Sequence, residues 1–82
     1  MLNPNQVRKA AQEVVAEMIG KKVGDADYLI SSGLIDSLSI LKLIGNLENR
    51  LSVTIPAGDL QPDDFESVDF ITDTVLRVAR SR

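Results

Sequence analysis

Few residues in this chain could perform chemistry, and the one that stands out is Ser37. The 82 residues include no histidine and no cysteine, which removes the commonest general base, the Ser-His-Asp triad, the zinc-thiolate site and the thiol nucleophile. Ser37 follows Asp36, a residue type that caps helices, so its hydroxyl is expected at a helix start and facing solvent. A phosphate attached there would lie at the positive end of the helix dipole. Ser37 is therefore a candidate for modification, and the chain is not expected to be an enzyme.

Two other kinds of site are weaker candidates. Ser37 does not lie in a Gly-x-Ser-x-Gly motif and has no histidine to activate it, which argues against a hydrolase nucleophile. Asp25-Ala26-Asp27 begins like a calcium loop, but Leu29 and Ile30 occupy positions that need a ligand and a glycine. We therefore expect no metal site. The acids of the third quarter of the chain are interpreted as helix-start and solvent-facing residues: Asp63, Asp64, Glu66 and Asp69. The alternative is that they face the basic patch of a partner.

Composition and charge narrow the class of protein. The net charge of −3 and the isoelectric point near 4.7 argue against binding to DNA, RNA or an anionic membrane. Hydrophobic residues make up 44 % of the chain but aromatic residues only 4 %, so an aromatic platform for nucleic acid is not expected. The sequence has neither a signal-peptide pattern nor the roughly 18 apolar residues of a membrane span. We expect one cytoplasmic, monomeric domain over residues 1–82.

Hydrophobic periodicity predicts the elements that must position Ser37. A first helix is expected over residues 4–19, between the cap-and-proline pair Asn3-Pro4 and Gly20. Residues 20–36 then form a long but packed loop, because its apolar groups would dock onto helices rather than face water. The second helix is expected over residues 37–51. Its apolar positions are Leu38, Leu41, Ile44, Leu47 and Leu51, broadened by Ile40 and Leu43.

The remaining third of the chain predicts one extended segment and two more helices. Residues 52–56 are extended, since Pro56 disfavours helix before it. A short helical turn follows near residues 62–65, and Ser67 caps a last helix over residues 68–80. No strand pattern capable of forming a sheet is visible. The expected fold is a small four-helix bundle of three main helices and a short third one.

The string Gly33-Leu34-Ile35-Asp36-Ser37-Leu38 resembles the attachment signature of the acyl carrier protein and peptidyl carrier protein family. The resemblance covers nearly the whole chain. It extends from the Asp27-Tyr28-Leu29-Ile30 segment before the motif, through Val53-Thr54-Ile55-Pro56, to Leu60–Val68 at the entry to the last helix. An Asp-Ser-Leu tripeptide alone is a weak signal. It becomes strong at the start of the second of four helices in a chain of this length.

The resemblance implies an all-α, acyl-carrier-protein-like up-and-down bundle with 4′-phosphopantetheine, drawn from coenzyme A, esterified to Ser37. The terminal thiol of that arm would carry an acyl or aminoacyl group as a thioester. Asp36 and Leu38 would be recognised by a phosphopantetheinyl transferase, with Asp36 helping to hold magnesium-bound coenzyme A. A loading ligase and downstream acyl-processing enzymes would be the other partners, reading the second helix.

The sequence also departs from the pattern of carriers in fatty acid synthesis. The second helix of carriers in that pathway is usually acidic. Here Ser39 and Lys42 occupy positions where the resemblance predicts acids. Ser39, Lys42 and Glu48 are therefore the expected partner surface. A specialised carrier, serving a dedicated ligase or a secondary-metabolite pathway, fits better than a housekeeping one. The alternative is an unmodified interaction module that binds a partner through its second helix.

Overall fold

The computed structural model describes residues 2–81, which form three α-helices around one aliphatic core. The helices are α1 (Pro4–Ile19), α2 (Ser37–Leu51) and α3 (Val68–Val78). The expected bounds of the first two are confirmed, and the third ends two residues earlier than expected. No helix within the described range is long and apolar enough to cross a membrane.

The first helix is bounded by the residues that the sequence indicates. The Asn3 side chain accepts the backbone N–H of Asn5 at 2.8 Å, and Pro4 occupies a position where no N–H is needed. At the other end Gly20 adopts a left-handed conformation with φ of 79° and donates its N–H to the carbonyl of Ala16. This is the usual glycine ending of a helix.

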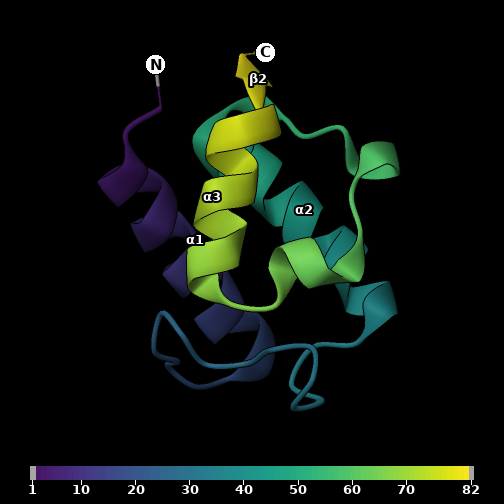
Figure 1. Cartoon of the computed structure of the whole chain (residues 1–82). Coiled ribbons are helices and arrows are strands. Elements are labelled where there is room, and N and C mark those ends of the chain that lie inside the picture. Colours follow the sequence, from purple (N-terminus) through teal and green to yellow (C-terminus); the bar gives the residue numbers. More distant parts are fainter. Residues whose placement is uncertain (1, 82) are drawn as a thin grey trace.

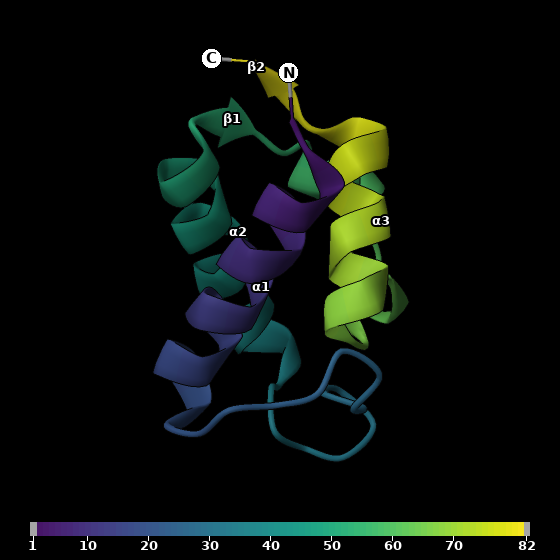
Figure 2. The ribbon, with the colours of Figure 1, turned by 90° about the vertical axis from the view of Figure 1, so that its left-hand side faces the viewer.

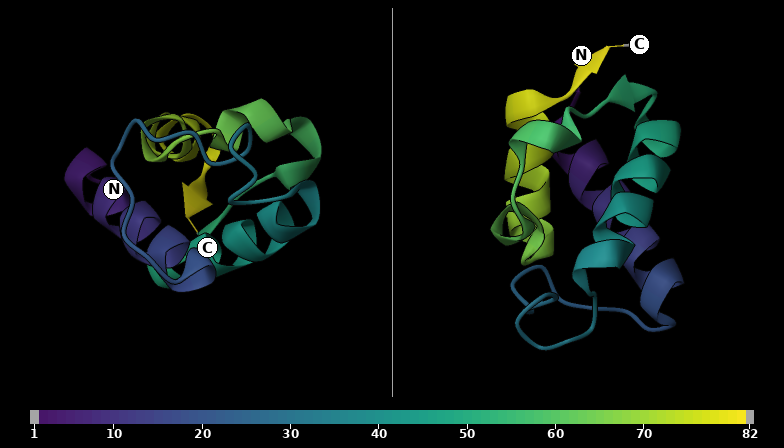
Figure 3. Two further views of the ribbon diagram at one scale, coloured as in Figure 1. Left: turned by 90° about the horizontal axis from the view of Figure 1, so that it is seen from below. Right: turned by 90° about the vertical axis from the view of Figure 1, so that its right-hand side faces the viewer.

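The helices run up and down (Figure 1). α1 is antiparallel to α2 and α3, and the segment of residues 52–67 returns the chain so that α3 runs parallel to α2 (Figure 2). α1 packs against both other helices. The long loop, residues 20–36, crosses beneath all three helices (Figure 3). The start of α1 and residues 80–81 lie together at the opposite end (Figure 2).

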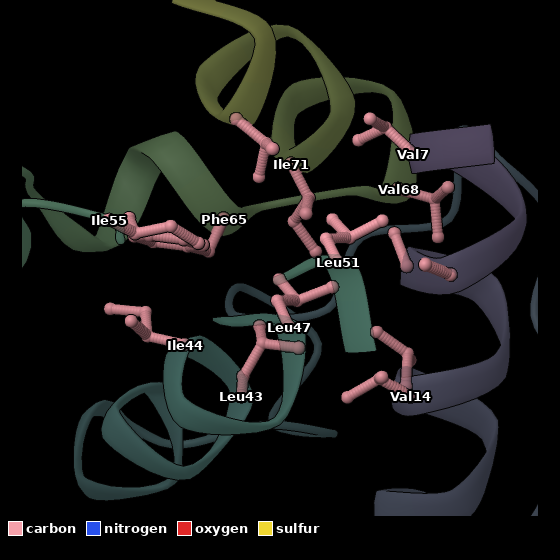
Figure 4. Close-up of a cluster of buried hydrophobic side chains, with 14 of the residues drawn as sticks. Val7, Val14, Leu43, Ile44, Leu47, Leu51, Ile55, Phe65, Val68 and Ile71 are labelled. Carbon is pink, nitrogen blue, oxygen red and sulfur yellow. The ribbon is translucent and has the colours of Figure 1, made fainter. Parts of the chain in front are cut away.

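The core is built from one apolar stripe of each helix, closed by the segments between them (Figure 4). Val7 and Val14 of α1 face residues of α2 and α3, while Ile55 and Phe65 fill the side away from α1. All of these side chains are at most 4 % exposed. The other buried apolar residues are Ala10, Ala11, Val15, Leu29, Ile35, Ile40, Leu43, Ile44, Leu47, Leu51, Val53, Val68, Ile71 and Val75.

The expected core face of α2 was partly wrong. Leu38 and Leu41 are 81 % and 65 % exposed, whereas Ile40 and Leu43 are 7 % and 0 % exposed. The reason is the helical period: steps of three residues rotate steadily away from one face, because a turn takes 3.6 residues. The buried residues of α2 are separated by a mixture of three- and four-residue steps, which keeps them on one side of the helix: Ile40, Leu43, Ile44, Leu47 and Leu51.

The returning segment and the residues after α3 each contain a short strand that the sequence analysis missed. Strand β1 (Val53–Thr54) pairs antiparallel with β2 (Arg80–Ser81), with Val53 opposite Ser81. The expectation of no sheet, and of a helix to residue 80, was therefore wrong. Ala79 turns to extended backbone after α3, and a two-residue strand is too short to show alternation.

The short helix expected in this segment is present but is not an α-helix. It is the 3₁₀ helix η2 (Pro62–Phe65), and a second 3₁₀ turn, η1 (Ala57–Asp59), precedes it. η2 contacts both α2 and α3 and links them. The bundle thus has three α-helices rather than four, and its short element is a 3₁₀ turn.

Candidate functional site

Ser37 is the first residue of α2, and its side chain takes no part in capping the helix. The cap is Asp36, whose Oδ1 accepts the backbone N–H of Ser39 at 2.8 Å. Both Asp36 and Ser37 are exposed. Because Asp36 satisfies the helix end, the Ser37 hydroxyl is left available at the surface.

The electrostatics of this helix end favour an anion. Hydrogen bonding from the backbone N–H of Ser39 holds the pKa of Asp36 below its usual range, and Lys42 one turn further on acts in the same direction. The first turn of α2 contains no acidic residue. A phosphate on Ser37 would lie beside the remaining backbone N–H groups at the positive end of the helix dipole.

The long loop that leads to Ser37 is fixed by one buried acid, Glu66. Its carboxylate accepts the backbone N–H groups of Ile30 at 3.0 Å and Ser31 at 3.1 Å, and its carbonyl oxygen accepts that of Leu29 at 2.6 Å. Hydrogen bonding from Ser31, followed by that from Ile30, lowers the pKa of Glu66 against the opposing effect of burial. Glu66 is 9 % exposed. Its expected place on a solvent-facing surface was therefore wrong.

Two buried side chains anchor the part of the loop between Glu66's partners and Ser37. Leu29 and Ile35 are 0 % and 2 % exposed, and the Ile35 N–H donates to the Leu29 carbonyl at 2.9 Å. Between them Gly33 turns the chain with φ of 81°, a conformation that suits glycine. Ile35 immediately precedes Asp36, so the loop delivers the capping residue and Ser37 from a fixed point in the core.

A second set of contacts ties the loop to α1 and α3. The Arg8 guanidinium lies 3.5 Å from the Asp25 carboxylate and 3.1 Å from that of Asp69. The Asp69 N–H also donates to the Asp25 carbonyl at 3.0 Å, and the Gln12 amide donates to the Asp25 carboxylate. These two acids thus hold elements together, whereas the sequence indicated only solvated residues.

The expected partner residues do not gather in one place. Leu38 lies next to Ser37 and is too exposed to belong to the core edge. Ser39 and Lys42 follow on the first turns of α2, with Lys42 exposed. Glu48 is near the far end of the helix, where its carboxylate accepts the Ile55 N–H at 2.8 Å and holds the start of the returning segment.

Sequence reasoning missed two residues of this end of the molecule. Leu41 was assigned to the core, but it is exposed beside Leu38 and enlarges the apolar surface next to Ser37. Glu66 was missed because its partners are backbone N–H groups about 35 positions away. No side-chain pattern marks such partners.

A three-helix bundle that presents an uncommitted serine hydroxyl at the start of its second helix defines a small carrier domain. Its residues fit a covalent phosphate-linked arm, since the hydroxyl is exposed and the first turn of α2, after the Asp36 cap, contains no acidic residue. Residues 7–75 match the family described as "Phosphopantetheine attachment site". The chain belongs to this family of phosphopantetheine-binding carrier proteins, and its cofactor is covalently bound 4′-phosphopantetheine.

The chain is also similar to named carrier proteins along most of its length. It is 29 % identical over 68 residues to the D-alanyl carrier protein of Streptococcus sanguinis, covering 80 % of this chain and 86 % of that protein. It is 28 % identical over 74 residues to that of Streptococcus gordonii, covering 88 % and 94 %. The D-alanyl carrier protein of Leuconostoc citreum is 27 % identical over 63 residues, covering 74 % and 81 %.

Proposed function

We propose that this protein carries an acyl or aminoacyl group on a 4′-phosphopantetheine arm esterified to Ser37. The observation that carries the proposal is the position of Ser37: it is exposed, it begins α2, and Asp36 does the capping. When attached, the arm supplies a terminal thiol that holds the cargo as a thioester. The protein's own residues fix the helix start, expose the hydroxyl and offer the surface that enzymes recognise.

The modification step assigns one role to each residue of the motif. The Ser37 oxygen forms a bond to the phosphorus on the pantetheine side of coenzyme A, adenosine 3′,5′-bisphosphate departs, and the hydroxyl proton passes to the transferase. Asp36, kept ionised by Ser39, stays an anion that can help hold the magnesium-bound coenzyme. Leu38 offers the transferase an exposed apolar contact beside the reacting oxygen.

The cargo and partners follow from the relatives and from the surface of α2. The relatives are named for D-alanine, so an amino acid loaded by a dedicated ligase is the first cargo to test. Ser39 and the exposed Lys42 give the first turns of α2 no acidic character, which favours a specialised pathway over housekeeping fatty acid synthesis. We infer a monomeric cytoplasmic shuttle whose contacts with each enzyme are brief.

Intact mass spectrometry tests the proposal directly. The chain is incubated with coenzyme A, magnesium and a broad-specificity phosphopantetheinyl transferase, alongside Ser37→Ala and the neighbouring control Ser39→Ala. A gain of one phosphopantetheine by the parent and by Ser39→Ala, but not by Ser37→Ala, supports it. No gain by folded parent protein would instead favour an unmodified module, and a gain by Ser37→Ala would place the arm on another residue.

A further inference from the structure

A groove to which α2 contributes no lining residue gathers both exposed aromatic side chains of the described residues. It has a volume of about 610 Å³ and lies between the long loop, η2 and α3, where the loop passes below η2 and the first turn of α3 (Figure 1). The chain has three aromatic residues in all. Phe65 is buried in the core, whereas Tyr28 and Phe70 are 65 % and 51 % exposed and both line this groove. We call it the Tyr28–Phe70 groove.

Exposed rings in one hollow differ from scattered apolar residues. Single exposed apolar side chains are common on proteins, but aromatic side chains grouped in a concave site are typical of binding surfaces. Here Tyr28 comes from the loop and Phe70 from α3, so the two side chains line one groove only because the fold brings these segments together. Neither ring belongs to the core, which is formed by aliphatic residues and Phe65.

The charge around the two rings is negative, which selects the occupant. Asp63 and Asp73 also line the groove, are exposed, and form no ion pair within residues 2–81. Asp64 is partly neutralised by Arg77 at 3.6 Å. Glu66, at the groove floor, is committed to the loop N–H groups. The carboxylates of the groove that have neither an ion pair nor a structural role are therefore those of Asp63 and Asp73, which line it together with the two rings.

We propose that the Tyr28–Phe70 groove binds an arginine-bearing segment of a partner protein. A guanidinium is flat, so it stacks on an aromatic face while its N–H groups reach carboxylates in the same plane. A lysine ammonium would satisfy the carboxylates but would gain less from the rings. The partner would approach a face formed by the loop, η2 and α3, and none of the residues that line this groove belongs to α2.

The single tyrosine makes the groove accessible to a direct measurement. The chain has one tyrosine and no tryptophan, so intrinsic fluorescence reports on Tyr28. The full chain is titrated with an end-capped Gly-Arg-Leu-Arg-Gly peptide and with the same peptide carrying citrulline, which keeps the shape of arginine without its charge. We expect a saturable change in Tyr28 fluorescence, and binding about tenfold weaker for the citrulline peptide.

Variants separate the groove from general attraction between opposite charges. Asp63→Asn with Asp73→Asn, and separately Phe70→Ala, should each weaken the arginine peptide, whereas Asp59→Asn in η1 removes an equally exposed acid outside the groove and should not. Equal binding of the two peptides, or an equal effect of Asp59→Asn, would overturn the proposal. Because no coenzyme A or transferase is involved, the result is independent of whether Ser37 carries the arm.

Discussion

Glu66 offers both carboxylate oxygens to the backbone N–H of Ser31, at 3.1 Å each, across 35 positions of sequence. The same side chain accepts the N–H of Ile30, and its carbonyl oxygen accepts that of Leu29. One residue at the entry to α3 therefore holds three successive N–H groups of the loop that leads to Ser37. Such a loop would otherwise contribute unsatisfied backbone groups and considerable conformational freedom.

Glu66→Gln should loosen the loop and slow the modification of Ser37. The amide keeps one acceptor oxygen but loses the charge that strengthens the hydrogen bonds. We expect faster hydrogen exchange at Ile30 and Ser31, and kcat/KM for phosphopantetheinyl transfer lower by about tenfold. Both are measured well below the melting temperature, where a change in global stability alone would not alter the rate. The control is Asp63→Asn, which removes an exposed acid from the neighbouring turn.

The two readouts of this experiment fail separately. Unchanged exchange at Ile30 and Ser31 would show that Glu66 does not hold the loop. Faster exchange with unchanged transfer would show that the order of the loop is irrelevant to the enzyme. Absence of transfer to the parent protein would instead contradict the proposed role of Ser37.

Stability should fall in acid, because Asp36 and Glu66 both have a lowered pKa in the folded protein. Their ordinary pKa in the unfolded chain is about 4. Above that value both carboxylates are ionised in the folded and in the unfolded protein, and their full contribution to stability is present. As the pH falls below that value, the unfolded protein binds protons before the folded protein does. The contribution of the two carboxylates is therefore lost as the pH falls through their lowered pKa in the folded protein. Urea unfolding across this range should show a shallower acid dependence for Glu66→Gln than for the parent; identical slopes would contradict the assignment.

Replacing the cap and replacing the serine should have different effects on stability. Asp36→Ala removes the acceptor for the Ser39 N–H and should lower the melting temperature by a few degrees. Ser37→Ala removes a hydroxyl that is outside the cap, so the melting temperature should hardly change. Thermal unfolding followed by circular dichroism compares them. A larger loss for Ser37→Ala would mean that the serine, not the aspartate, caps α2.

Two leucines of α2, one exposed and one buried, provide a test of the orientation of this helix. Leu47 is 0 % exposed and Leu41 is 65 % exposed. Leu47→Ala should reduce the free energy of unfolding by about 2–5 kcal/mol, and Leu41→Ala by less than about 0.5 kcal/mol. Denaturant unfolding measures both. An equal loss of unfolding free energy for Leu41→Ala and Leu47→Ala would show that both leucines belong to the core, as simple three-residue spacing indicates.

Two glycines with equally open surroundings should respond to alanine in opposite ways. Gly33 has a φ of +81°, whereas Gly45 lies within α2, and a Cβ at either would meet nothing within 4 Å. Gly33→Ala should cost about 1 kcal/mol because L residues are strained at that φ. Gly45→Ala should stabilise the protein by about 0.5–1 kcal/mol through helix propensity. Stabilisation by Gly33→Ala would show that the loop does not need this turn.

Much of the fold could be predicted from the sequence because local signals mark it. Asn3-Pro4 and Gly20 bound α1, and Asp36 caps α2, at the residues where caps and breakers were recognised. Stepwise spacing failed on Leu41, because periodicity has to be followed around the helix and not only along it. The β1–β2 pair was hidden for another reason: its two strands are short, and their pairing depends on where the helices end.

The residues at the centre of the candidate site could be predicted from the sequence, but the residues that hold the surrounding loop in place could not. Ser37 and Asp36 carry a recognisable pattern, and the family match covers both. Three features arise because distant segments are brought together: the burial of Glu66, its bonds to loop N–H groups, and the groove that Tyr28 and Phe70 both line. One-dimensional spacing contains no trace of them. Glu48 shows the same limit, since its bond to the Ile55 N–H gives a structural role to an expected partner residue.

The beginning of α1 and strand β2 share one end of the bundle, and Ser37 lies at the other (Figure 2). α2, which separates them, has 15 residues and is therefore about 22 Å long. A surface linker or fluorescent label attached at the start of α1 or at β2 would therefore be separated from the serine by about the length of this helix. The molecule could thus be immobilised through that end of the bundle, with the Ser37 hydroxyl directed away from the support.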